Sequence, residues 1–244
     1  RTTRPTSDHF LSNYTRLLKV AIDEGVDAII YGAGLPSKLP SFANSANVKL
    51  IPIVSPARAA RLICKTWDAR YARLPDALIV EGPLAGGHLG FSMSDVLSSS
   101  GTTLESLVSE VIEVAGEFEP KAGRKIPVVA AGGIFDGADI ARFLKLGASG
   151  VQMATRFVCT DECDASDEFK REYINARPED IVVLSSPVKM PLRVIRNRFV
   201  EKIQSGGCAN FECRYHCLLT CEPKKTSYCR SEERRVGKEC RSRW

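Results

Sequence analysis

The chain has 244 residues, of which 44% are apolar and 26% charged, enough material for one sizeable hydrophobic core and typical of a globular protein. No stretch approaches the roughly 18 consecutive apolar residues of a membrane span, and the first four residues, Arg-Thr-Thr-Arg, lack the apolar core of a secretion signal. We therefore expect a cytoplasmic protein with no membrane partner. The net charge of +5 is not gathered into a basic stripe with interleaved aromatic residues, so nucleic acid is not an expected partner either.

Short apolar runs bounded by Gly, Pro or Asp predict five buried strands, and amphipathic stretches beside them predict helices. The expected strands are residues 28–31, 50–54, 77–80, 127–131 and 150–154. The expected helices are residues 9–24, 56–67, 104–118 and 137–146. Near-continuous apolar strands that alternate with helices indicate parallel βαβ units, whose strands are covered on both faces. The sequence therefore predicts an α/β fold.

Glycines that directly follow the strands favour a closed barrel over an open doubly wound sheet. They include Gly82 and the pair Gly132 and Gly133, at the edge of the sheet where ligands bind. In (β/α)8 barrels a phosphate commonly docks at the loops after the last two strands, whereas the GxGxxG that opens a dinucleotide-binding open sheet is absent here. Five strands are countable where a barrel needs eight. The prediction is a (β/α)8 (TIM) barrel, N-terminally truncated, with about the last five strands present.

One histidine, His88, follows two glycines and is expected on a loop that leaves the third expected strand. Gly86 and Gly87 carry no Cβ, which would let the backbone approach a flat ligand closely. An imidazole that titrates near neutral pH is suited to remove a proton next to an electron-withdrawing group. A lone histidine on a loop is more often structural, so the interpretation of His88 as a general base depends on the motif around it.

Three segments together carry a family resemblance: residues 81–90 with Gly-Gly-His, residues 127–134 with Ala-Gly-Gly, and residues 150–157 with Gln-Met-Ala-Thr. In this order and spacing the sequence resembles the nitronate monooxygenase (2-nitropropane dioxygenase) family, from about residue 10 to residue 229. The resemblance implies an FMN-dependent oxidoreductase that oxidises alkyl nitronates or nitroalkanes with molecular oxygen. The expected partners are therefore these small molecules and oxygen.

The resemblance also implies roles for individual residues, with His88 as the catalytic base. Backbone N–H groups at glycine-rich turns, and the hydroxyl of Thr155, are suited to bind the FMN phosphate. Glu81 departs from the family pattern, because many relatives have Gln there. The expected cofactor-binding residues are Glu81, Gly86, Gly87, Gly132, Gly133, Gln152, Met153, Ala154 and Thr155.

Two alternative functions follow from other features of the sequence. A related branch of the same fold family contains flavin-dependent enoyl-ACP reductases, which also carry a Gly-Gly-His and use NAD(P)H. The second alternative belongs to another class, a catalytically inactive metal-binding or scaffold fragment, and it rests on cysteines that gather late in the chain. Cys213, Cys217, Cys221 and Cys229 could hold zinc or an iron–sulfur cluster, although their spacing matches no standard signature.

The domain organisation predicted from the sequence has three parts. Residues 1–207 form the partial flavin-binding barrel, and residues 208–230 form a Cys-rich extension. Residues 231–244 show neither a helical nor a strand period and are interpreted as a non-native tail. The earlier cysteines, Cys64, Cys159 and Cys163, are expected to be ordinary buried thiols.

Overall fold

The computed structural model describes residues 16–32, 34–43, 47–98, 101–207, 222 and 225–229. The chain divides into two compact units, which we describe separately. The parallel-sheet unit comprises Ser12–Ala85 and Ser94–Met153, and the hairpin unit comprises Arg1–Leu11, Gly86–Met93 and Ala154–Trp244. The predicted boundaries at residues 207 and 230 stay predictions, since the segment between them lies mostly outside the described residues.

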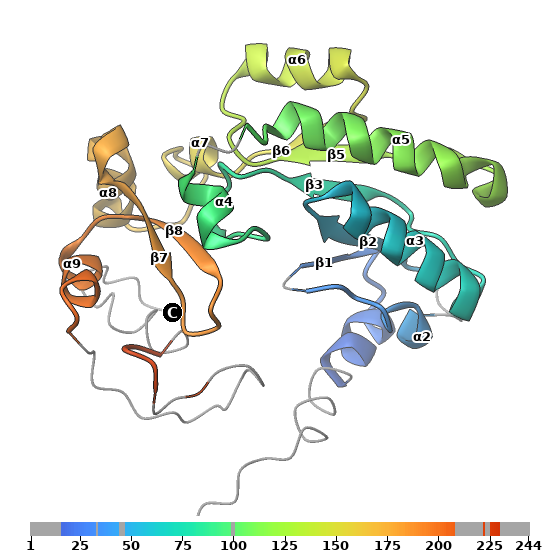
Figure 1. The fold of residues 1–244 in the computed structure, drawn as a ribbon, viewed down its shortest axis with the longest axis horizontal. Helices are drawn as coiled ribbons and strands as arrows, with labels where there is room; N and C mark the ends of the chain where they lie inside the picture. Colours follow the sequence, from blue (N-terminus) through green and yellow to red (C-terminus); the bar gives the residue numbers. More distant parts are fainter. Residues whose placement is uncertain are drawn as a thin grey trace, which may run out of the picture. The chain divides into compact units, whose positions relative to one another are not determined.

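The parallel-sheet unit contains five parallel strands that neighbour one another in sequence order (Figure 1). They are β1 (Ala28–Tyr31), β2 (Lys49–Val54), β3 (Leu78–Glu81), β5 (Val128–Ala131) and β6 (Gly150–Gln152). All five predicted strands are therefore confirmed, with ends that differ by at most two residues. The apolar runs were sufficient to locate them because β3 and β5 are almost wholly buried.

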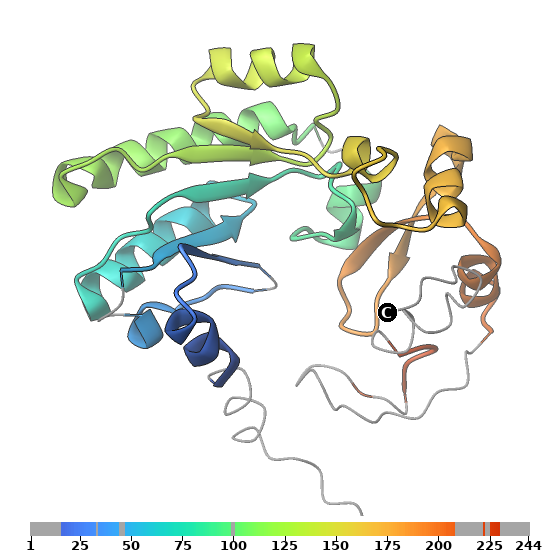
Figure 2. The same ribbon diagram turned by 180° about the vertical axis from the view of Figure 1, so that it is seen from behind.

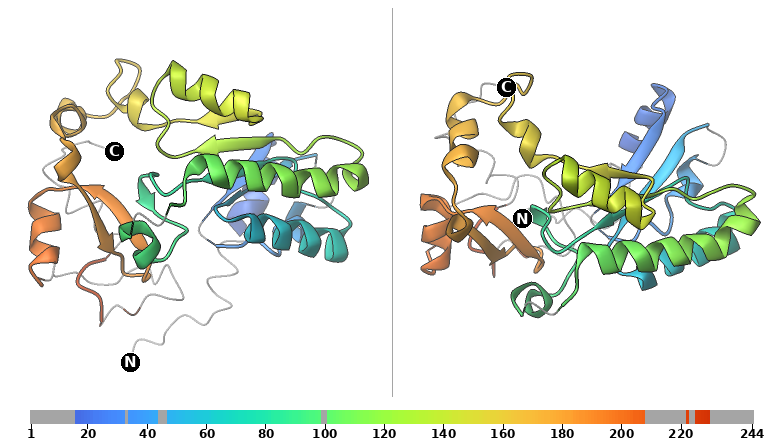
Figure 3. Two further views of the ribbon diagram at one scale, coloured as in Figure 1. Left: turned by 45° about the horizontal axis from the view of Figure 1, so that its top comes forward. Right: turned by 90° about the horizontal axis from the view of Figure 1, so that it is seen from above.

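Helices α3 (Ala57–Tyr71), α5 (Leu104–Ala122) and α6 (Gly137–Leu146) form the second layer of this unit. Helix α3 packs against α5, and α5 packs against α6, β3 and β5. Helices α3 and α5 lie in front of the sheet in Figure 1 and behind it in Figure 2, and Figure 3 shows them side by side. Strands in sequence order with helices on one face are the winding of a (β/α)8 barrel, since a doubly wound sheet reverses its strand order. The predicted fold class is confirmed.

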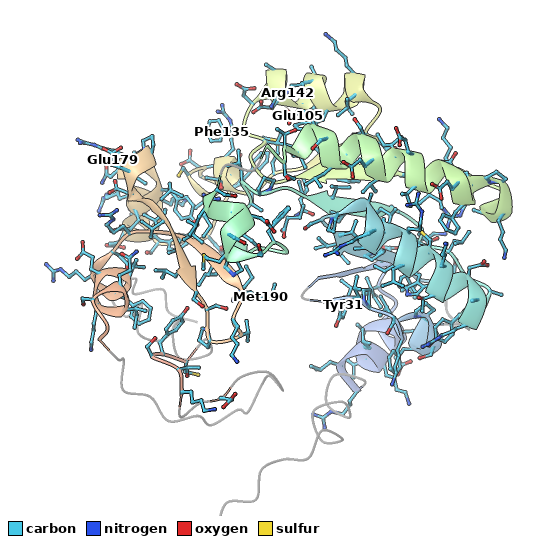
Figure 4. The ribbon with its side chains drawn as sticks, viewed as in Figure 1. Tyr31, Glu105, Phe135, Arg142, Glu179 and Met190 are labelled. Carbon is cyan, nitrogen blue, oxygen red and sulfur yellow. The ribbon has the colours of Figure 1, made fainter. Side chains whose placement is uncertain are left out.

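Local signals fix where helices α5 and α6 begin and end. Thr103 accepts a hydrogen bond from the N–H of Ser106 at the start of α5, and Asp136 accepts one from the N–H of Asp139 at the start of α6. Both helices end at glycines in the left-handed region. Between the helices, Arg142 Nε lies 3.4 Å from Glu105 Oε1 (Figure 4). Helix 137–146 is therefore found where it was predicted, because each of its ends is encoded locally.

The amino edge of the sheet is held by a polar network centred on Asp76. Its carboxylate accepts a hydrogen bond from the N–H of Leu50 at 2.9 Å, and Arg73 and Arg124 both contact it. Both guanidinium groups also donate to backbone carbonyl oxygens nearby. Because these donors are already paired within the protein, the network stabilises the unit at the edge opposite to the ligand-binding end of a barrel.

The hairpin unit contains a three-stranded antiparallel sheet with the order β4-β8-β7, which the sequence did not predict. Its strands are β4 (Gly87–His88), β7 (Ile181–Ser185) and β8 (Pro191–Ile195). Other short elements within the described ranges include α2 (Pro40–Ala43), α4 (Met93–Leu97), α7 (Thr155–Val158), α8 (Asp167–Asn175), the 3-10 helix η1 (Pro178–Asp180) and α9 (Arg198–Gln204). Among the described residues, no helix is both long enough and apolar enough to cross a membrane.

Candidate active site

The carboxyl ends of three neighbouring strands bring one group of predicted site residues together. In the sheet register Glu81 of β3 pairs with Ala131 of β5, and Ala131 pairs with Gln152 of β6. Gly132 and Gly133 follow β5 directly, and Met153 follows β6. Glu81, Gly132, Gly133, Gln152 and Met153 therefore lie along one edge of the parallel sheet, the edge at which barrel enzymes bind their ligands.

The two glycines after β5 are required by the backbone and by close packing. Gly132 has φ +93° and Gly133 has φ +80°, a region that favours glycine. A Cβ on Gly132 would lie 2.9 Å from Ala85 Cβ, and a Cβ on Gly133 would lie 2.9 Å from Leu84 Cβ. The turn after β3 therefore packs directly on this glycine pair. Packing accounts for the glycines without any ligand, and their role in phosphate binding stays a prediction.

The carboxyl edge nevertheless offers groups that fit an FMN phosphate. Gly133 is exposed, and no hydrogen bond within the described part of the chain uses its N–H. Gln152, at the end of the neighbouring strand, is also exposed. An exposed N–H at a glycine turn beside an amide side chain is a suitable donor set for a phosphate.

Glu81 contributes a partly buried carboxyl group to this edge. It is partly buried, and this burial raises the pKa of its carboxyl group above the ordinary value. A carboxyl group whose charged form is disfavoured in this way can donate a hydrogen bond more readily than an exposed one. Burial thus disfavours the negative charge that distinguishes Glu81 from the Gln of many relatives.

His88 lies on a strand, whereas the sequence predicted a loop. It pairs with Leu192 of β8, and the N–H of the following residue, Leu89, donates to Pro191 O at 2.9 Å. Leu192 pairs in turn with Leu184 of β7, so the half-buried His88 shares one face of the sheet with two buried leucines. This backbone pairing fixes the direction in which the imidazole leaves the chain.

The two glycines before His88 differ in kind from the pair after β5. A Cβ on Gly86 or on Gly87 would meet open space, so packing within the protein does not require glycine at either position. Gly87 does have φ +80°, which favours glycine for conformational reasons. Open space beside a short strand is consistent with the predicted close approach of a ligand to residues 86–87.

Arg193 is a polar residue of this region that the sequence interpretation missed. It pairs with Gly87 across β4 and β8, on the face of the sheet opposite to His88. Partial burial lowers the pKa of its guanidinium group below the ordinary value. Gly87 and Arg193 are neighbours only because two distant segments pair, and no local pattern could have revealed this.

The predicted site residues are divided between the two units. Glu81, Gly132, Gly133, Gln152 and Met153 belong to the parallel-sheet unit, whereas Gly86, Gly87, His88, Ala154 and Thr155 belong to the hairpin unit. Ala154 and Thr155 are exposed and stand at the start of the four-residue helix α7. Each unit therefore gathers its own share of the predicted residues.

The cysteine predictions have mixed outcomes. Cys64 is fully buried as expected, and burial raises the pKa of its thiol to about 12. Cys159 is exposed, so its expected burial is wrong, because helix α7 and the residues that follow it lie on the surface. Cys213, Cys217 and Cys221 lie outside the described residues, while Cys229 is buried with a free thiol. Within the described ranges, no group of three or more His, Cys, Asp and Glu residues could hold a metal ion.

Comparisons with known proteins relate this chain to one family. The family model of nitronate monooxygenase matches residues 4–232. A Mycobacterium tuberculosis protein named (3aS,4S,5R,7aS)-5-hydroxy-7a-methyl-1-oxo-octahydro-1H-indene-4-carboxyl-CoA dehydrogenase is 35% identical over 79% of this chain and 48% of its own length. A probable nitronate monooxygenase of Staphylococcus aureus strain Newman is 32% identical over 75% of this chain and 47% of its own length.

A solved structure extends the likeness to the fold. FabK from Thermotoga maritima superimposes with a TM-score of 0.62 at 33% sequence identity, covering 84% of this chain and 55% of its own. The chain thus spans about half the length of the relatives that it matches. The match to the family model extends over nearly the whole chain, and the chain belongs to the nitronate monooxygenase family.

Proposed function

We propose that this chain forms part of an FMN-dependent enzyme that oxidises alkyl nitronates with molecular oxygen, with His88 as the general base. The observation that carries the proposal is the placement of His88 on the paired strand β4, directly after two glycines with open space beside them. The family match and the resemblance to a probable nitronate monooxygenase support the substrate class.

FMN, when bound, would accept electrons from the substrate and pass them to oxygen. Its phosphate would be held by the N–H of Gly133 and by the segment from Gln152 to Thr155, and Gly86 would allow close approach to the cofactor. Glu81, at the same edge of the sheet, would donate a hydrogen bond while its carboxyl group is protonated.

His88 would convert a neutral nitroalkane into the nitronate that is then oxidised, by removing a proton from the carbon that bears the nitro group. An imidazole nitrogen is a suitable acceptor at neutral pH, and a fixed strand keeps it at a constant position relative to the substrate. Leu192, which faces the same side of the sheet, would limit the access of water to the imidazole.

Replacing His88 by Ala in the full-length protein tests this assignment. We expect kcat with nitroalkanes to fall by about 10²- to 10⁴-fold, the usual range for losing a general base, while the visible spectrum of bound FMN is retained. Lys202→Ala, on the exposed side of α9, is the control and should leave turnover unchanged. Unchanged turnover in His88→Ala would remove His88 from the base role, and a protein that cannot be reconstituted with FMN would contradict the flavin assignment.

A second candidate is a flavin-dependent reductase of acyl thioesters that uses NAD(P)H, as in the enoyl-ACP reductases. It is favoured by the relative named as a CoA-thioester dehydrogenase and by the structural likeness to FabK. The two candidates predict opposite results in one pair of assays. Oxygen uptake with an alkyl nitronate and no NADH oxidation with enoyl thioesters selects the monooxygenase, and the reverse selects the reductase.

A further inference from the structure

A cavity of about 270 Å³ lies within the hairpin unit, at the turn that joins β7 to β8. Its walls come from this turn and from the described residues near the end of the chain. Lys189 and Lys225 supply two ammonium groups, Glu222 supplies one carboxylate, and Ser186 and Thr226 supply hydroxyl groups. The volume is below the range of roughly 300–1,000 Å³ of pockets that enclose a whole small molecule. The cavity is therefore suited to one end of a ligand.

Ser186 is the first sign that the cavity is built for a ligand. Its backbone is fully used, since its N–H donates to Met190 O at 2.9 Å and its carbonyl oxygen accepts from the N–H of Lys189 at 2.8 Å. Its side chain is only 4% exposed, yet among the described residues its Oγ has no hydrogen-bond partner. Leaving a buried hydroxyl unsatisfied is unfavourable, and a ligand atom in the cavity would satisfy it.

The backbone conformation of Lys189 is the second sign that the cavity is built for a ligand. Its φ of +62° places a non-glycine residue in the left-handed region, where a Cβ crowds the adjoining backbone. The tight turn from Ser186 to Met190 requires that conformation, which glycine would adopt without strain. Backbone strain of this kind concentrates at functional sites. A lysine at a position where glycine would be unstrained is consistent with a role for the lysine ammonium group.

The charges of the lining select the kind of ligand. Lys225 Nζ lies 2.6 Å from Glu222 Oε2, so that pair is neutral overall, and Lys189 leaves a net positive charge. A cation surrounded by hydroxyl donors matches the several acceptor oxygens of a phosphate group.

The position of the cavity connects it to His88. Lys189 lies two residues before β8 begins at Pro191, and Leu192, the second residue of β8, is the residue that pairs with His88. We propose that this cavity binds the phosphate group of a substrate or electron donor whose reacting part extends toward His88. The link to His88 rests on the proposed function, whereas phosphate binding by the cavity does not.

Calorimetric titration of the full chain with inorganic phosphate tests the proposal. We expect Lys189→Gly and Ser186→Ala each to weaken phosphate binding at least tenfold, because each removes a donor from the cavity. Lys202→Ala, an exposed lysine of the same unit, is the matched control and should leave the affinity unchanged. Equal affinity in the wild type and both cavity variants, or equal weakening in the control, would overturn the assignment.

Two further pairs of titrations identify the source of the phosphate. Coenzyme A against its 3′-dephospho form tests an acyl carrier, and NADPH against NADH tests an electron donor. In each pair, at least tenfold tighter binding of the phosphorylated compound in the wild type, lost in Lys189→Gly, would support that source. None of these measurements needs flavin or turnover, so a failure of the nitronate proposal and a failure of the phosphate proposal are distinguishable.

Discussion

Replacing Gly132 by Ala tests how the carboxyl edge of β5 is built. The substitution places a Cβ at φ +93°, which costs about 1–2 kcal/mol for an L-residue in the left-handed region. The same Cβ would stand 2.9 Å from Ala85 Cβ and 3.0 Å from Ala85 N. Because the backbone atoms of residue 85 cannot rotate away, relieving this overlap should cost about 1–3 kcal/mol more. We therefore expect a total loss of roughly 2–5 kcal/mol from a free energy of unfolding that is typically about 5–15 kcal/mol.

Urea denaturation followed by far-ultraviolet circular dichroism measures this loss. Gly116→Ala is the matched control, since Gly116 lies inside α5 and a Cβ there meets open space. That control should stabilise the protein by about 0.5–1 kcal/mol, because alanine loses less backbone entropy than glycine in a helix. If Gly132→Ala unfolded within about 0.5 kcal/mol of the wild type, the range of ordinary surface substitutions, the close packing of residues 84–85 on this turn would be refuted.

Three more predictions concern Glu81, two cysteines and Lys189. Burial raises the pKa of Glu81 in the folded state, so the folded protein binds the carboxyl proton more tightly than the unfolded protein does. The folded protein therefore loses stability as pH rises through that pKa. Glu81→Gln should therefore be more stable than the wild type at pH 7, with the difference vanishing toward pH 4; a constant difference in denaturation midpoint would contradict this cause. Iodoacetamide at pH 8 should alkylate exposed Cys159 and spare Cys64, whose thiol pKa is about 12, and peptide mass spectrometry that found equal labelling would be the contrary result. Lys189→Gly should raise the melting temperature without ligand, because relieving φ +62° gains about 1–2 kcal/mol, whereas the greater entropy of unfolded glycine costs only about 0.4–1 kcal/mol. A lower melting temperature would argue against strain at that turn.

The segments predicted from local pattern agree closely with the structure, and the reason is physical. Strands β3 and β5 are buried on both faces, so each had to be a continuous apolar run that a single sequence displays. Helix α6 has an aspartate cap at one end and a glycine at the other, and both signals are readable without any tertiary information. Once the strands are located, the glycines that directly follow them, such as Gly132 and Gly133, are placed at the carboxyl edge of the sheet.

The hairpin unit shows where local pattern fails. Strand β4 is two residues long, and it exists only because residues 87–88 pair with residues 192–193 from far along the chain. A segment so short carries no alternation of its own, which is why His88 was expected on a loop. The juxtaposition of Gly87 with Arg193 has the same origin.

The sequence by itself determined the α/β class, the order of strands and helices, and the family motif that singles out His88, because each is encoded in residues close together in the chain. Tertiary structure alone decided what those residues contact. It assigned Gly132 and Gly133 to packing against residues 84–85, gave Glu81 a burial that raises its carboxyl pKa, and paired His88 with β8. It also placed residues 225–228 at the cavity beside the turn that contains Ser186 and Lys189. Burial and close approach depend on segments that are distant in sequence, so they emerge only when the chain folds.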